Sequence, residues 1–219
     1  MSSNIKEWES GLLIELGERV IQFGFDPTPR DQSFYRKFDG GKHALHVSFI
    51  KHTVDFDVTA DVAVRFDALE ELVNGFAPKL SKKIKDQTFS LGAELGNISG
   101  EGQCRWTIAS KADVVTAASG ISEKFKVVGI PYLERFSSLE SVLEALSGDD
   151  KAAWLHSPIH GVRAKRAIAA AFLLNKKQAF LELVEKKTQF LKERNDFGLQ
   201  DFLEMADDLR EKMLQPTQR

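Results

Sequence analysis

The stretch VDFDVTADVAVRF, residues 54–66, decides which fold the sequence predicts. Every second residue of this stretch, beginning with its first, is apolar, whereas those between are mostly polar. Successive side chains of a strand point to opposite faces of a sheet, so this alternation predicts a long strand with one buried and one solvent-facing side. The solvent-facing side carries Asp55, Asp57 and Asp61. Three carboxylates in such a row are typical either of ordinary solvation or of an acidic recognition surface.

The preceding segment, HALHVSFI at residues 43–50, alternates in the same way and predicts a hairpin with the long strand. A turn at His52 and Thr53 aligns the two apolar stripes, whereas a slip of one residue would turn one stripe towards water. In this register His46 lies on the same face as the three aspartates.

Helices and shorter strands are predicted around this hairpin from the spacing of apolar residues and from turn signals. A glycine-rich hairpin loop is expected between the last two strands. The predicted strands are 33–38, 43–50, 54–66, about 87–95 and about 103–110, and the predicted helices of this part are 4–23, 67–76 and 111–128.

The chain beyond about residue 130 has only helical periodicity, with short connections that favour a small antiparallel bundle. Gly129-Ile130-Pro131 is expected to end or kink the helix before it. The predicted fold class is therefore α+β: an antiparallel sheet of about five strands with helices on one face, followed by a helical C-terminal part. We expect an α+β domain at 1–130 and a helical subdomain at 131–219, either independent or packed as one unit.

Composition indicates an ordinary globular protein, with 42% hydrophobic and 28% charged residues in 219. The net charge of −2 gives no general attraction to nucleic acid or to anionic membranes. Cys104 is the only cysteine, which excludes an internal disulfide and a multi-cysteine metal site. No signal peptide or run of about 20 apolar residues is present, so a cytoplasmic location without a membrane span is expected.

The candidate binding residues are His46, Asp55, Asp57 and Asp61. Carboxylates and imidazole are ligands for divalent cations, but the flat face of a sheet rarely makes such ligands converge. We therefore expect no metal and no cofactor. The alternatives that remain are a solvated sheet face and an acidic surface that recognises a basic protein partner.

Other motifs give weaker indications of chemistry. His156 and His160 have the spacing of a helical zinc pair, but the sequence HSPIH lacks the glutamate of HExxH and has a proline in its middle. Ser157 is not part of a nucleophile elbow, and Cys104 has the position of a buried structural cysteine. The basic segment 163–187 would suit phosphate contacts, although glutamates within it are typical of a solvated helix face.

One part of the chain, about residues 16–75, resembles certain uncharacterised bacterial domain families. In these families a leading helix ends in a Gly-Phe pair, here Gly24-Phe25, and a Phe-Tyr-Arg strand, here Phe34-Tyr35-Arg36, precedes a central hairpin. The families have no established chemistry, so the resemblance implies a bacterial origin and, from some members, an immunity or accessory role.

The leading hypothesis is a non-catalytic cytoplasmic protein that binds a protein partner through the acidic sheet face, in the manner of an immunity protein. The first alternative is a hydrolase-like enzyme with a site between sheet and helical part, in which His46, His156 or His160 would meet carboxylates. The second is nucleic-acid binding through the 163–187 segment, which the net charge disfavours.

Overall fold

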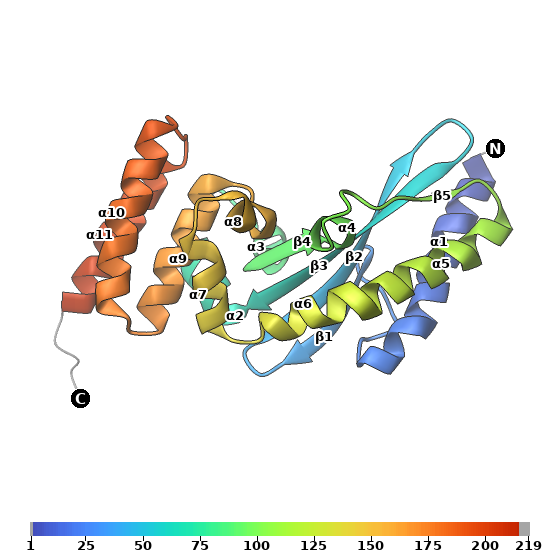
Figure 1. The fold of residues 1–219 in the computed structure, drawn as a ribbon, viewed down its shortest axis with the longest axis horizontal. Helices are drawn as coiled ribbons and strands as arrows, with labels where there is room; N and C mark the ends of the chain where they lie inside the picture. Colours follow the sequence, from blue (N-terminus) through green and yellow to red (C-terminus); the bar gives the residue numbers. More distant parts are fainter. Residues whose placement is uncertain (1, 215–219) are drawn as a thin grey trace. The chain divides into compact units, whose positions relative to one another are not determined.

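The computed structural model describes residues 2–214 and confirms the α+β class, with a five-stranded antiparallel sheet. The strand order is β1-β2-β3-β4, and β5 also pairs with β3 (Figure 1). The strands are β1 (Ser33–Phe38), β2 (Gly41–Lys51), β3 (Phe56–Phe66), β4 (Leu91–Glu94) and β5 (Trp106–Ile108).

The central hairpin forms as its alternating pattern predicts, but its turn lies one residue later. The amide of His52 donates a 3.0 Å hydrogen bond to the carbonyl of Asp55, which places Thr53 and Val54 at the turn. Moving a turn by one residue changes the pairing by two positions, so both apolar stripes stay on one face. The apolar positions from Phe56 to Val64 are accordingly fully buried.

The prediction of a hairpin between the last two strands is wrong. The fourth and fifth strands each pair with β3, and they are separated by a helical turn, α4 (Leu95–Ile98). Glu94 stabilises this turn, because its carboxylate accepts hydrogen bonds from the amides of Gly96, Asn97 and Cys104. The chain is thereby turned away from β4 before β5 begins.

Helices cover the apolar face of the sheet, where Leu12 and Leu16 of the first helix and Ile121 of the fifth are fully buried. The helix expected to stop or kink at Gly129-Ile130-Pro131 instead continues through a π-helical turn (Figure 1). Proline has no amide hydrogen for the preceding turn, and the wider π-turn accommodates that loss. These elements are α1 (Ser2–Val20), the 3-10 turn η1 (Ile21–Phe23), α5 (Lys111–Lys124), the π-turn η2 (Phe125–Gly129) and α6 (Ile130–Arg135).

The chain forms two compact units, each built from two stretches of sequence. Unit 1 comprises the residues up to Val64 together with 92–135, and unit 2 comprises 65–91 together with 136–219. Residues 65–91, which a division at residue 130 assigns to the α+β domain, therefore belong to the same unit as the C-terminal helices.

The central helix of unit 2 is α9 (His160–Leu173), which contacts α2, α7, α10 and α11. Its alanines, among them Ala167, Ala169 and Ala170, are completely buried and let helices approach from several sides. The remaining helices are α2 (Asp67–Gly75), α3 (Lys82–Asp86), α7 (Leu139–Ser147), α8 (Lys151–His156), α10 (Lys177–Glu193) and α11 (Leu199–Leu214). Across residues 2–214, no helix combines the length and apolar character that a membrane span requires.

Candidate functional site

Asp57, in the middle of the predicted acidic row, is engaged with neighbouring side chains. Its Oδ1 accepts a 2.7 Å hydrogen bond from the Thr107 hydroxyl, and its Oδ2 lies 3.6 Å from Arg105 and 3.4 Å from His52. The Thr107 hydrogen bond, followed by His52 and Arg105, lowers the pKa of Asp57. Because a cation and a histidine surround it, this carboxylate contributes little net negative charge to the sheet face.

Asp61 lies in a different environment, with reduced access to solvent. Burial, and to a lesser extent the nearby carboxylate of Glu94, raises its pKa to about 6. Glu94 is itself only 7% exposed and is held by three backbone amides. Asp61 is therefore the proton-sensitive member of the row: it is mostly ionised at pH 7 and takes up a proton as the pH falls through about 6.

The other two predicted binding residues have separate surroundings. The Nδ1 atom of His46 lies 2.8 Å from the Ser33 hydroxyl on the neighbouring strand, and burial lowers the pKa of the imidazole. Asp55 is half-buried and contributes its carbonyl to the hairpin turn. Among residues 2–214, no three histidine, cysteine or acidic side chains are arranged to hold a metal ion.

The histidines of the second half of the chain also have ordinary packing partners. The His156 ring packs edge-to-face on Phe136, with ring centroids 4.9 Å apart. His160 packs on Phe190, and its Nδ1 lies 3.0 Å from the Arg163 guanidinium. These contacts explain why His160 has a lowered pKa, through burial first and the adjacent arginine second.

The basic segment 163–187 is largely turned inward. The side chains of Arg163 and Lys187 are 1% and 0% exposed, and Arg166 forms two hydrogen bonds with the buried Glu70. Lys165 is 10% exposed. The exposed lysines of the segment are Lys176 and Lys177 at the start of α10 and Lys186, which is 56% exposed. The segment is an internal ionic framework of unit 2.

A groove that was not among the predicted sites runs between α1 and α5 of unit 1. It has a volume of about 360 Å³, and its apolar lining includes Trp8, Ile14, Val114 and Val115. Ile14 is 64% exposed and Val115 is 50% exposed, although both are large aliphatic residues. The charged residues of the lining are Glu7, Glu15 and Lys111, and its small residues are Ser10 and Gly11.

A sequence signal for this groove did exist. Ile14 falls outside the apolar stripe of the first helix that contains Leu12 and Leu16, so an amphipathic helix gives it no place in the core. Large apolar side chains that gather on an exposed surface mark interaction sites more often than single ones do. The groove is therefore a candidate binding surface of unit 1.

Comparison with known proteins identifies no relative: no protein-family model, no curated protein and no solved structure matches the chain.

Proposed function

We propose that this chain is a non-catalytic binding protein that recognises a protein partner through the groove between α1 and α5. The observation that carries the proposal is the exposure of Ile14 and Val115 at the groove, 64% and 50% respectively. Leaving such side chains in water forgoes the free energy that their burial would contribute, roughly 25 cal/mol per Å². Covering them with a partner recovers that free energy.

The shape and charge of the groove favour an amphipathic helix as the bound element. Two parallel or antiparallel helices leave a linear depression between them, into which a third helix places side chains at three- and four-residue spacing. Glu7 and Glu15 lie two helical turns apart along α1, and both line the groove. Glu15 is paired with Arg19 of the same helix at 2.6 Å, so the charge complementarity with a lysine or arginine beside the apolar stripe of such a helix rests on Glu7.

This proposal keeps the immunity-type role but moves its binding surface. A cationic toxin remains the partner class, since acidic side chains flank the groove. Arg105 and His52 offset Asp57 on the sheet face, as Arg19 offsets Glu15 at the groove. The exposed Ile14 and Val115 therefore favour the groove more than charge does.

The test is a comparison of partners captured from the native host by the wild type and by variants. Ile14→Asp with Val115→Asp places two charges in the groove, and we expect the captured partner to fall at least about tenfold, measured by quantitative mass spectrometry. The matched control is Ile21→Asp with Val127→Asp, because these residues are 54% and 68% exposed but lie outside the groove. The control should retain the partner.

A third variant, Asp55→Lys with Asp57→Lys, decides between the two surfaces. Loss of the partner in this variant, together with its retention by Ile14→Asp with Val115→Asp, would assign binding to the sheet face. Circular dichroism of every variant checks that the fold is intact. A partner held equally by all four proteins would contradict the groove.

A further inference from the structure

A short basic segment of unit 2, residues 79–85 with the sequence KLSKKIK, forms an exposed surface that the longer basic segment does not provide. Four of its seven residues are lysines, namely Lys79, Lys82, Lys83 and Lys85. Between them, Leu80 is 37% exposed and Ile84 is 49% exposed. Cations and aliphatic side chains thus lie together on one solvent-facing stretch.

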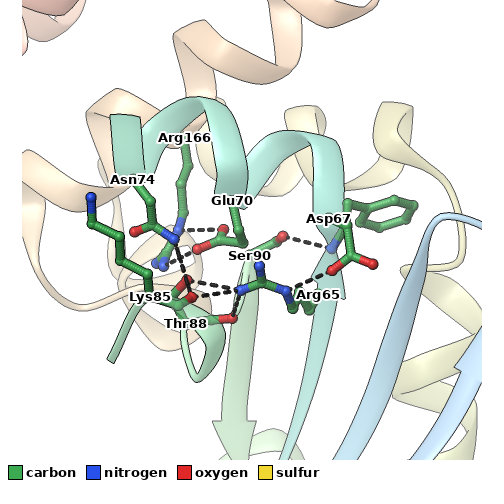
Figure 2. A network of polar contacts seen from close by, with 9 residues as sticks. Arg65, Asp67, Glu70, Asn74, Lys85, Thr88, Ser90 and Arg166 are labelled. Carbon is green, nitrogen blue, oxygen red and sulfur yellow. Dashed lines mark hydrogen bonds and ion pairs between the residues drawn. The ribbon is translucent and has the colours of Figure 1, made fainter. Parts of the chain in front are cut away.

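The segment is firmly anchored to the body of unit 2. Arg65, whose side chain is 7% exposed, donates from Nη1 to the carbonyls of Lys85 and Thr88, at 3.1 Å and 2.6 Å. Asn74 Nδ2 donates to the same Lys85 carbonyl at 3.2 Å and to the Thr88 hydroxyl at 2.9 Å. Figure 2 shows that the Lys85 side chain extends away from this network while its carbonyl accepts the hydrogen bonds.

This anchoring gives a basic segment with a defined shape. Ser81 caps α3 by accepting a hydrogen bond from the amide of Ile84, and the end of the helix is held through Lys85. Because the backbone is fixed in this way, the lysines and the two aliphatic side chains are presented without a further entropic cost of ordering the chain.

A pocket of about 380 Å³ lies beside the segment. Its lining includes the cationic Lys82 and Lys85, the buried Arg65 and the amide of Asn74. The full lining is completed by Glu71, Gly75, Leu80 and Asp86. Arg65 is paired with Asp67 at 2.7 Å, and its Nη1 and the Asn74 amide already donate within the protein. Lys82 and Lys85 therefore supply the donors that suit the oxygens of a phosphate group.

We propose that residues 79–85 dock unit 2 onto an anionic lipid surface. The lysines would contact phosphate-bearing headgroups, while Leu80 and Ile84 enter the boundary between headgroups and acyl chains. This proposal is independent of the protein-binding groove, which belongs to unit 1.

The aliphatic side chains decide between a lipid surface and nucleic acid as the anionic partner. Nucleic acid would use the lysines but would leave Leu80 and Ile84 in water, whereas a bilayer interface buries them beside the cations. Single-stranded nucleic acid is held by stacking on aromatic rings, and the segment contains none. The combination of residues therefore favours lipid.

The test measures sedimentation of the full chain with vesicles of phosphatidylcholine alone and with 30% phosphatidylserine added, a fraction chosen at roughly the level that gives a physiological surface potential. We expect binding only to the anionic vesicles, with an affinity that falls as salt is added. Lys82→Gln with Lys83→Gln should weaken binding about 25-fold, since each lysine near the surface contributes about fivefold. The matched control, Lys176→Gln with Lys177→Gln, removes equal charge from α10 and should change binding less than about threefold.

A second variant separates lipid from other polyanions. Ile84→Ser should weaken vesicle binding severalfold and leave binding to duplex DNA at low salt unchanged. Three outcomes would overturn the proposal: no binding of the wild type to anionic vesicles at low salt, equal losses in the two lysine variants, or an Ile84→Ser variant that binds vesicles like the wild type. The groove variant Ile14→Asp with Val115→Asp should keep vesicle binding, so each proposal fails separately.

Discussion

Two buried ionic clusters of unit 2 balance their charges differently. In the first, Glu70 is fully buried and receives two parallel 2.9 Å hydrogen bonds from Arg166, so one anion meets one cation (Figure 2). In the second, Asp149 lies 2.7 Å from Lys187 and 3.6 Å from Arg163, so one anion meets two buried cations. The first cluster is a matched bidentate pair, and the second is cation-rich.

The cation-rich cluster is completed by backbone carbonyls. Lys187 also donates to the carbonyl of Gly148 at 2.7 Å, just beyond the end of α7, and Arg163 donates to that of Ser157 at 2.6 Å. Carbonyl dipoles carry only partial charge, and burial lowers the pKa of Lys187 to about 8. Both partners of a buried matched pair therefore stay ionised, whereas a cation-rich cluster can release a proton when its surroundings change.

The largest effect is expected from breaking the matched pair. Arg166→Met leaves the Glu70 carboxylate in the interior without its cation, and removing one partner of a buried pair typically costs about 3–5 kcal/mol. Urea unfolding measures this loss. The control is Arg210→Met on α11, whose 42%-exposed side chain pairs with Asp207 at the surface and should change stability by less than about 0.5 kcal/mol. Equal effects of both substitutions would contradict the distinction between buried and surface pairs.

Breaking the cation-rich cluster should cost less, although it leaves two cations behind. In Asp149→Asn the amide oxygen still accepts a hydrogen bond, and Lys187, whose pKa is already about 8, can lose its proton instead of remaining charged. We expect a loss of about 2–3 kcal/mol at pH 7 that becomes smaller at pH 9. Urea unfolding at both pH values measures it, and a loss that grows with pH would exclude proton release by Lys187.

The parts of the fold that follow from local periodicity were predictable from the sequence. The alternation of residues 54–66 and the helical spacing of the first helix each report on one element, and the structure confirms both. The separate pairing of β4 and β5 was not predictable, because it depends on how the Glu94 carboxylate gathers three amides. No sequence period encodes that arrangement.

The candidate sites were harder to predict, because charge on a strand or helix does not show what faces it. Asp57 meets Thr107, fifty residues later, and Arg166 meets Glu70, ninety-six residues earlier. These distant partners convert an acidic row and a basic segment into paired or buried groups. The groove and the 79–85 segment stay exposed. In the sequence, the groove shows only as Ile14 outside the apolar stripe of its helix, and the segment shows as four lysines around Leu80 and Ile84.

Asp61 of unit 1 contrasts with Lys187 of unit 2. Burial and the carboxylate of Glu94 raise the pKa of Asp61, whereas burial lowers that of Lys187. A raised carboxyl pKa means that the folded state binds a proton more tightly, so this group's contribution to stability falls as pH rises from about 4 to about 6. Asp61→Asn removes the effect. We expect the variant to equal the wild type near pH 3 and to be more stable by roughly 2–3 kcal/mol at pH 7. Thermal unfolding at both pH values checks this, and a variant less stable at pH 7 would contradict it.

The smallest effect should come from removing the excess cation of the second cluster. Lys187→Met replaces a fully buried ammonium with an apolar side chain of similar length, and Asp149 keeps Arg163 within 3.6 Å. The lost hydrogen bonds and the relieved desolvation oppose each other, so stability at pH 7 should change by less than about 1 kcal/mol. In the wild type the lowered pKa makes the unfolded state bind more protons above about pH 8, so this group raises stability as pH increases towards 10. Urea unfolding across that range should show the rise in the wild type and its absence in Lys187→Met; the same rise in both proteins would place the titrating group elsewhere.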